Sequence, residues 1–153
     1  MEEKTLHRNF MGYTSGKTAL MVGLGMSAIS DSWYSFAQNV KTVEEYQEIV
    51  NQGEIPLLRG HLLSEEDLII RKHILNIMCH FETSWKNADQ QTPAFFEGLK
   101  LLDEMKEDGL VAVEGDKLTV PEKGRLFVRN ICMCFDARMI RNKPETRIFS
   151  QTV

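Results

Sequence analysis

Cysteine is scarce in this sequence, which has three among its 153 residues: Cys79, Cys132 and Cys134. Three cysteines cannot form the even-numbered framework that holds small secreted domains together. All three lie in apolar stretches, which is typical of free thiols in a reducing compartment. We therefore expect a cytoplasmic protein without disulfide bonds.

Long hydrophobic runs and an excess of positive charge are also missing. No segment approaches the roughly 20 apolar residues of a membrane-spanning helix, and the first ten residues lack the apolar core of a signal peptide. Lysine and arginine number 18 against 22 aspartate and glutamate residues, a net charge of −4. The sequence therefore predicts a protein that binds neither membrane nor nucleic acid. Its length suffices for a globular core.

The most apolar stretch of the first half is residues 19–29, which also contain glycine. A short apolar run bounded by turn signals is typical of a strand buried on both faces of a parallel sheet. Such a strand needs neighbouring strands and helices that this chain does not supply. We expect residues 1–53 to be the last piece of a larger α/β catalytic domain whose beginning is missing, and residues 54–153 to be a helical domain packed on it.

Two glycine motifs near the N-terminus resemble nucleotide-binding signatures but do not meet their requirements. Residues 12–18 resemble a P-loop, yet three residues separate Gly12 from Gly16 where that loop has four. Gly23, Gly25 and Ala28 resemble a dinucleotide fingerprint, but no helical apolar period follows them. We expect these glycines to serve close packing within the buried strand.

Residues 31–40 have no clear period and are expected to form a loop. Thr42 and Glu45 form a capping box, which predicts a helix over 43–52 that ends at Gly53. Its inner face is expected to be Val43, Tyr46 and Val50. Residues 53–63 then read as a linker between domains.

The second half predicts helix, helix, hairpin, helix. Ser64 and three acidic residues start the first helix, residues 82–91 form a polar loop, and Thr92-Pro93 starts the second helix, which ends at Gly109. Residues 110–120 alternate and turn at Gly115-Asp116, as in a β-hairpin. The last helix is expected over 121–141. The inner faces are Ile70, Ile74, Ile77, Met78 and Phe81; Phe95, Leu99, Leu102 and Met105; and Phe127, Ile131, Cys134 and Phe135.

This order defines the predicted fold class: α+β, mostly helical, with a winged-helix-like C-terminal domain preceded by the terminal strand and loop piece of an α/β barrel. In a DNA-binding winged helix, the helix before the hairpin enters the major groove. Here that helix carries five acidic residues against two lysines and would repel phosphates. The wing is therefore expected to be a packing module.

Few residues group into a recognisable chemical site. Cys132 and Cys134, two apart on a helix, point about 200° apart, so we expect them in the core and not on a metal. His73 and His80 are expected at the surface, and no catalytic triad can be proposed from spacing. Arg125 and Arg129 lie four apart, on one helix face. They either pair with acids of this chain or, with Arg8, bind a polycarboxylate ligand.

Several longer motifs resemble one family. They are His-Arg-Asn-Phe-Met-Gly-Tyr-Thr at residues 7–14, Gly-Leu-Gly-Met-Ser-Ala-Ile-Ser at 23–30, Ala-Gln-Asn at 37–39 and, above all, Gly-Arg-Leu-Phe-Val-Arg-Asn-Ile-Cys-Met-Cys-Phe-Asp at 124–136. They resemble the C-terminal third of oxygen-independent coproporphyrinogen III oxidase, and the likeness extends over nearly the whole chain.

The resemblance implies a radical S-adenosylmethionine (SAM) enzyme of haem biosynthesis. In that family a [4Fe-4S] cluster cleaves SAM, and the resulting radical takes a hydrogen from a propionate of coproporphyrinogen III. Loss of carbon dioxide and one electron leaves a vinyl group, and two such events give protoporphyrinogen IX. The family's cluster ligands lie in a CxxxCxxC motif that this chain does not contain. We therefore expect this chain alone to bind no cluster or SAM and to be inactive, and its partner to be the missing N-terminal domain.

The resemblance also assigns single positions. Ile29 matches a residue that contacts a second SAM, and Phe10 and Met11 match a pair near the same site, where the family often has glutamine in place of Met11. Arg8, Arg125 and Arg129 remain the candidates for substrate carboxylates. The alternatives are the C-terminal part of a radical-SAM-like haem chaperone, and a winged-helix module for protein or nucleic-acid interaction. An exposed sheet edge would also let the chain dimerise.

Overall fold

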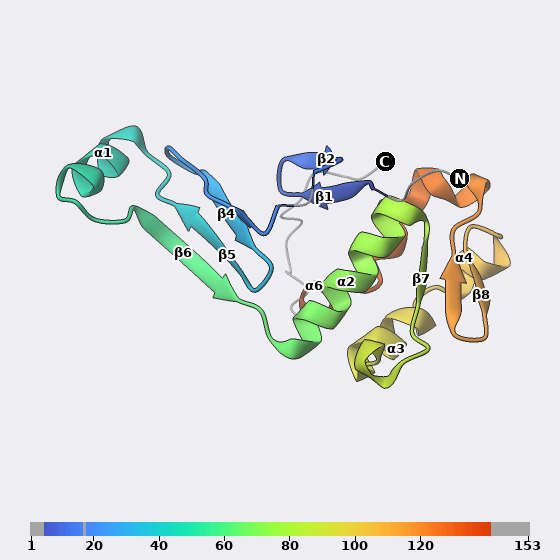
Figure 1. Cartoon of the computed structure of the whole chain (residues 1–153). Coiled ribbons are helices and arrows are strands. Elements are labelled where there is room, and N and C mark those ends of the chain that lie inside the picture. The colour runs from blue at the N-terminus through green and yellow to red at the C-terminus, as the bar shows by residue number, and fades with distance from the viewer. Residues whose placement is uncertain (1–4, 17, 142–153) are drawn as a thin grey trace. The chain divides into compact units, whose positions relative to one another are not determined.

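The computed structural model describes residues 5–16 and 18–141 of the chain (Figure 1). The chain divides into two compact units, Met1–Leu68 (unit 1) and Ile69–Val153 (unit 2). The division falls in the first turns of α2 (Glu65–His80), not at residues 53–54 as the sequence suggested. The expected linker contains a strand, β6 (Leu57–Leu62), that pairs with the sheet of unit 1. Within the described residues, no helix is both long and apolar enough to cross a membrane.

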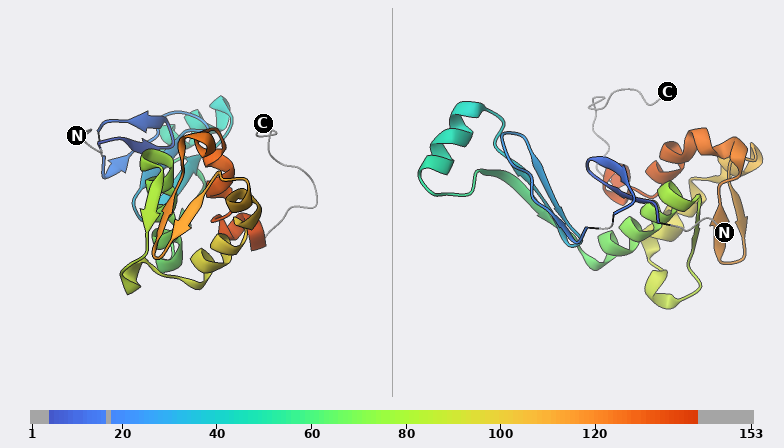
Figure 2. Two further views of the ribbon diagram at one scale, coloured as in Figure 1. Left: turned by 90° about the vertical axis from the view of Figure 1, so that its right-hand side faces the viewer. Right: turned by 45° about the horizontal axis from the view of Figure 1, so that its top comes forward.

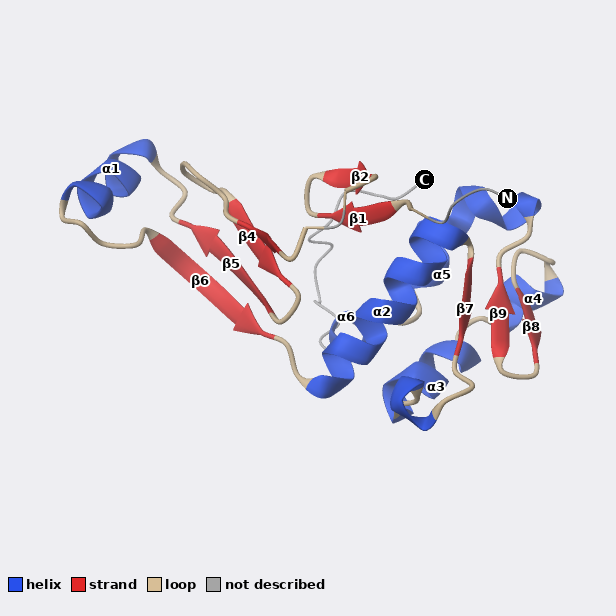
Figure 3. Cartoon of the chain, viewed as in Figure 1, coloured by secondary structure: helices blue, strands red, loops and turns tan. Residues whose placement is uncertain are grey.

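Unit 1 contains a two-stranded hairpin and a separate four-stranded sheet in the order β3-β4-β5-β6, in which every pair is antiparallel (Figure 3). The strands are β1 (His7–Asn9) and β2 (Gly12–Thr14) in the hairpin, and β3 (Leu20–Met21), β4 (Ile29–Ser32), β5 (Ser35–Asn39) and β6 in the sheet.

The prediction of a buried parallel strand at residues 19–29 is therefore wrong. Only Leu20 and Met21 of that run are in a strand before Ile29, because residues 22–28 form a loop with Gly25 at φ 95° and Ser27 at φ 58°. The prediction of a loop at residues 31–40 is also wrong. Most of it belongs to β4 and β5, joined by a tight turn in which the Ser32 hydroxyl accepts the Ser35 N–H at 3.0 Å.

Helix α1 (Val43–Asn51) starts and ends as predicted. Thr42 Oγ1 accepts the Glu45 N–H at 3.4 Å, and Gly53 adopts φ 78°, which suits the residue after a helix end. The predicted inner face is wrong, because Val43 and Val50 are both more than 40% exposed, at 47% and 44%. The helix has an apolar stripe, but no residue of α1 is buried.

Unit 2 has a winged-helix-like arrangement, as predicted. Its three strands lie side by side in the order β7-β9-β8, all antiparallel (Figures 1 and 2). The hairpin turns at Gly115-Asp116, and β7 adds a strand where the sequence suggested a loop. The elements are α2, β7 (Glu82–Ser84), the 3-10 turn η1 (Ala88–Gln90), α3 (Pro93–Lys100), α4 (Asp103–Glu107), β8 (Ala112–Glu114), β9 (Lys117–Thr119), η2 (Glu122–Phe127), α5 (Val128–Met133) and α6 (Ala137–Arg141).

The helices predicted over 93–108 and 121–141 are each divided. Near the end of the chain, the Asp136 carboxylate accepts the Met139 N–H at 2.9 Å and so starts a new helix, α6. Earlier in that region, Gly124 packs so closely on Leu110 that a Cβ would lie 2.8 Å from the Leu110 carbonyl carbon. The chain adopts 3-10 geometry there, and Phe127, predicted to face inward, is 43% exposed.

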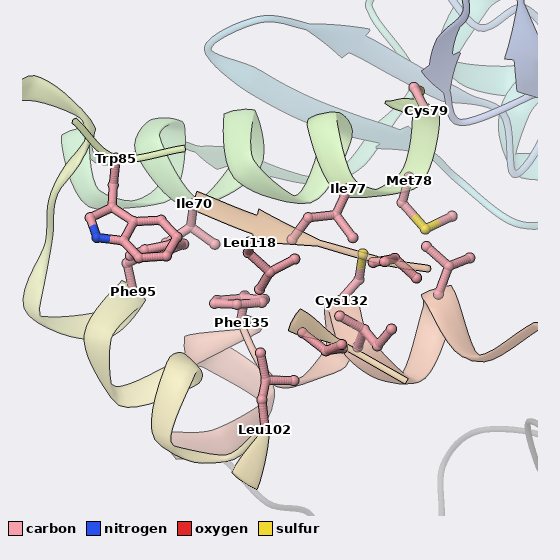
Figure 4. Close-up of a cluster of buried hydrophobic side chains, with 14 of the residues drawn as sticks. Ile70, Ile77, Met78, Cys79, Trp85, Phe95, Leu102, Leu118, Cys132 and Phe135 are labelled. Carbon is pink, nitrogen blue, oxygen red and sulfur yellow. The ribbon is translucent and has the colours of Figure 1, made fainter. Parts of the chain in front are cut away.

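One hydrophobic core fills unit 2 (Figure 4). Phe95 is at its centre, stacked on Phe135 with ring centroids 5.1 Å apart and tilted against Trp85 at 5.1 Å. The predicted inner faces of the helices supply seven of its fifteen buried members. The buried members are Ile70, Ile77, Met78, Cys79, Trp85, Ala94, Phe95, Leu102, Val111, Leu118, Val120, Val128, Ile131, Cys132 and Phe135.

Candidate functional site: one face of the unit 1 sheet

Two rows of side chains cross one face of the four-stranded sheet. Directly paired residues of antiparallel strands point to the same face. Register places Ile29 of β4 opposite Gln38 of β5, and Gln38 opposite Arg59 of β6. The neighbouring row runs from Met21 through Asp31 and Phe36 to His61. Successive residues of a row are about 5 Å apart, and the rows are about 7 Å apart.

The β1–β2 hairpin brings Phe10 onto this same face. Phe10 and Met11 form its two-residue connection, where the Asn9 side chain accepts the Met11 N–H at 2.9 Å and Gly12 takes φ 129°. The Phe10 ring meets the Phe36 ring edge to face, with centroids 5.0 Å apart. Phe10 and Ile29, which the family resemblance assigned to one site, therefore lie on one face. Met11 is 85% exposed at the hairpin tip.

The polar part of this face is a short hydrogen-bonded chain. Arg59 Nε donates to Gln38 Oε1 at 2.9 Å, and Gln38 Nε2 donates to the Ser27 carbonyl at 3.3 Å. The amide of Gln38 therefore orients the guanidinium of Arg59. Sequence reasoning missed both residues, because they lie 21 positions apart in segments expected to be loop and linker.

The glycine loop before β4 is held by side chains of its own unit. Asn39 Nδ2 donates to the carbonyls of Gly23 and Gly25 at 3.1 and 2.9 Å. The Gly23 N–H donates to Ser30 Oγ at 3.0 Å, and the Gly25 N–H to the Tyr46 hydroxyl at 3.1 Å. A Cβ on Gly23 would lie 2.8 Å from the Ile29 carbonyl oxygen. Gly23 thus serves close packing, although in a loop and not a strand, whereas a Cβ on Gly25 would have no atom within 4 Å and that residue supplies a positive φ of 95°. The amides of both glycines donate to side chains of unit 1.

The three arginines proposed from the sequence are divided between the two units. In unit 1, Arg8 lies over the Tyr13 ring, 5.2 Å from its centroid. In unit 2, Arg125 lies over the Phe81 ring at 4.7 Å, and Arg129 is exposed on α5. Cation–π contacts of this kind leave the edge of a guanidinium open to a carboxylate.

His73 contradicts its prediction as a surface residue. It is 2% exposed and stacks on Phe95 with centroids 4.1 Å apart. Its Nε2 donates to the Gln90 carbonyl at 2.7 Å, and Nδ1 lies 2.8 Å from Thr83 Oγ1. Burial lowers the pKa of His73 below its usual value, and nearby Lys72 lowers it further, against the hydrogen bond to Gln90. This neutral imidazole is part of the core.

The cysteines do not fit an iron–sulfur cluster. Cys79 is near the end of α2 and Cys132 is on α5 (Figure 4), both buried, and burial raises the pKa of the Cys134 thiol. Cys132 Sγ contacts the Ile74 carbonyl at 3.8 Å. Across residues 5–16 and 18–141, no three histidine, cysteine or acidic side chains converge as metal ligands. Iron–sulfur clusters are held by cysteine thiolates that converge on the iron atoms, and in the described residues Cys79, Cys132 and Cys134 do not converge in this way.

Comparison with known proteins places this geometry in a class. No family model matches the chain. A solved structure of the coproporphyrinogen III oxidase of Escherichia coli, a radical SAM enzyme, superposes with a TM-score of 0.78 and 42% identity over 88% of this chain and 32% of the oxidase. The chain therefore has the fold of one region of a radical SAM enzyme.

Relatives in sequence identify the enzyme more closely. Oxygen-independent coproporphyrinogen III oxidase of E. coli is 38% identical over 99% of this chain and 34% of its own length. Those of Synechocystis and Pseudomonas aeruginosa are 33% and 34% identical over 97% and 88% of the chain. The chain is homologous to the C-terminal part of the oxygen-independent coproporphyrinogen III oxidases. It spans about a third of the length of these relatives.

Proposed function

We propose that this chain acts as the C-terminal part of a SAM-dependent coproporphyrinogen dehydrogenase of haem biosynthesis. The complete enzyme would convert two propionates of coproporphyrinogen III to vinyl groups, giving protoporphyrinogen IX. The observation that carries the proposal is the likeness in sequence and fold to the oxidase over nearly the whole chain. The same likeness favours the oxidase over the haem chaperone and over a free winged-helix module.

The cofactors divide between this chain and the rest of the enzyme. A [4Fe-4S] cluster and SAM together supply hydrogen abstraction when bound, and residues outside this chain would hold the cluster. Phe10 and Ile29 fit a contact surface for SAM, because both present apolar side chains on one face of the sheet. Met11 at the hairpin tip would add a thioether contact where the related enzymes often have glutamine, and so would lack that amide's hydrogen bonds.

Substrate recognition would fall to cationic side chains. Coproporphyrinogen III carries carboxylates, and Arg8, Arg125 and Arg129 offer guanidinium groups for bidentate pairing. Arg8 and Arg125 are each steadied by an aromatic ring. The proposal does not require the three arginines to act as one group, because Arg8 is in unit 1 and Arg125 and Arg129 are in unit 2.

The partner of this chain would be the domain that precedes it in the oxidases. Unit 1 has many exposed apolar side chains, among them Leu20, Val22, Leu24, Ile55 and Leu62 at 61 to 83% exposure. An exposed apolar surface of this kind is typical of a protein interface. Dimerisation through a sheet edge stays a prediction. So does a cytoplasmic location, which agrees with free cysteines.

The test is a comparison of two proteins under anaerobic reconstitution with iron and sulfide. The full-length protein should convert coproporphyrinogen III with SAM to protoporphyrinogen IX, and Ile29→Asn should raise its KM for SAM. The 153-residue chain alone should form no cluster and no product. An active, brown 153-residue protein would overturn the division of labour, and a full-length protein that binds haem without converting coproporphyrinogen would favour the chaperone.

A further inference from the structure

The sheet face that carries Ile29 ends at a cationic side chain with no role so far. We propose that Arg59, held in place by Gln38, binds a carboxylate of the ligand that lies over Phe10 and Ile29. This rests on the proposed function, because it assumes that a ligand occupies this face. Carboxylates are present both in the methionine part of SAM and in the propionates of the porphyrinogen.

The first support is the geometry of the row that contains Arg59. Ile29, Gln38 and Arg59 are consecutive partners across β4, β5 and β6, so Arg59 lies about 10 Å from Ile29, two strand spacings away. A ligand of the size of SAM or of one porphyrinogen edge spans that distance. Its apolar part would contact Phe10 and Ile29 while its carboxylate reaches β6.

The second support is the way Arg59 is held. Its Nε is engaged by Gln38 at 2.9 Å, and Gln38 is fixed in turn by the Ser27 carbonyl. Within the described part of the chain, the Nη groups of Arg59 have no hydrogen-bond or ion-pair partner. Arg59 is an exposed residue of β6. A guanidinium fixed through Nε presents two parallel Nη–H donors, which is the arrangement that pairs with a carboxylate.

The third support is the contrast with the other arginine of unit 1. Arg8 lies over the ring of Tyr13, a contact within its own hairpin that engages the face of its guanidinium. Arg59 has an amide at its Nε and, among the residues that the structure describes, no aromatic ring against its guanidinium. The hydrogen bond from Gln38 to the Ser27 carbonyl also connects Arg59 to the loop that precedes Ile29.

The experiment measures binding in the full-length protein, with two probes. One is labelled SAM in equilibrium dialysis, and the other is coproporphyrin III, a fluorescent oxidised analogue of the substrate, in fluorescence polarisation. Arg59→Gln should weaken one of the two by about 10- to 100-fold, as expected for a lost charged hydrogen bond. The probe that weakens identifies the source of the carboxylate. Gln38→Ala should weaken the same probe by a smaller factor, because it removes only the positioning contact.

Controls separate binding from folding. Arg59→Lys keeps the charge but not the planar fork, so it should show an intermediate loss and a melting temperature like that of the wild type. Lys41→Gln removes one positive charge from the same unit and should leave both dissociation constants unchanged. If coproporphyrin III is the affected probe, its tetramethyl ester should bind wild type and Arg59→Gln equally.

The outcomes distinguish this inference from the proposed function. If the wild type binds both probes and converts the substrate, but Arg59→Gln and Arg59→Lys bind as well as the wild type, the role of Arg59 is overturned and the proposed function stands. If the wild type binds neither SAM nor coproporphyrin III, the proposed function fails and this inference fails with it.

Discussion

The two units of this chain bury apolar side chains to very different extents. Apart from Val40, every buried hydrophobic residue in the described part of the chain lies in unit 2. Unit 1 has two antiparallel pairing systems and a capped helix, yet its leucines, valines and aromatic residues are largely exposed. Regular secondary structure therefore does not imply a hydrophobic core in this chain. Hydrogen bonding alone contributes little net stability.

The difference also separates two roles for a sheet. In unit 2 the strand β9 pairs on both sides and its Leu118 is fully buried. In unit 1 the strands carry Phe36, Gln38 and Arg59 on a half-exposed face with a polar chain. A face that combines aromatic, aliphatic and cationic side chains suits a ligand or partner domain better than a core.

The largest expected effect that tests this contrast is in the aromatic centre of unit 2. Phe95→Ala should lower the free energy of unfolding of unit 2 by about 3–5 kcal/mol, because the residue is fully buried and its removal leaves a cavity. Urea denaturation, monitored by hydrogen exchange that is resolved by segment, measures this loss of unfolding free energy.

The neighbouring Phe96 provides the matched control, because it is 40% exposed. Phe96→Ala should cost less than about 1 kcal/mol, and protection of unit 1 should be unchanged in both variants. Equal costs for Phe95→Ala and Phe96→Ala would mean that the core of unit 2 is not centred where the structure has it.

An intermediate effect is expected at the buried histidine. Thr83→Val should destabilise unit 2 by about 1–3 kcal/mol, because it leaves His73 Nδ1 buried without a hydrogen-bond partner. Burial lowers the pKa of His73, so the unfolded state takes up the proton first. The stability that His73 contributes is therefore present above about pH 6.5 and falls as the pH drops below it.

Urea titrations of unit 2 at a series of pH values check both parts of this prediction. His80→Gln, in the last turn of the same helix, should leave the pH dependence in place, and His73→Gln should reduce it. Stability that rises as the pH falls through this range would contradict the assignment of a neutral His73.

The smallest effect is expected on the surface of unit 1. Leu62 is 80% exposed, so Leu62→Ser should change the unfolding free energy of this chain by less than about 0.5 kcal/mol. In the full-length protein the same change should cost about 2 kcal/mol, because there a partner domain would cover the leucine. Thermal denaturation of both proteins, with Lys41→Gln as the control, measures the difference. The same small cost in both proteins would argue against a covered leucine.

Local signals predicted the ends of elements well. Thr42, Thr92 and Gly53 start or end helices where the sequence placed them, because a cap depends on residues within one turn. Gly115-Asp116 likewise marks the observed hairpin. The signals failed where pairing is distant: residues of β6 pair with partners 18 to 27 positions away along the chain, and residues of β7 with partners 33 to 37 positions away.

Apolar period predicted burial in one unit only. The stripe on α2 is buried, whereas the similar stripe on α1 is exposed, since a stripe predicts a face that needs covering and says nothing of what covers it. His73 shows the same limit for polar residues. Its partners, Thr83 and Gln90, are 10 and 17 positions away, so its burial could not be deduced from its own segment.

The candidate site divides in the same way. Motifs in the sequence indicated the likeness to the oxidases and suggested Phe10 and Ile29 as site positions. The tertiary structure alone placed these two residues on one face and added Gln38 and Arg59 to it.

The amino-acid sequence by itself determined the caps, the turns, the apolar stripes and the kinship with the oxidases, because each of these depends on residues that are close together in the chain. Only the tertiary structure decided which stripes are buried and which side chains share the sheet face. Those properties depend on contacts between segments far apart in the chain, and the register of an antiparallel sheet sets them through pairing.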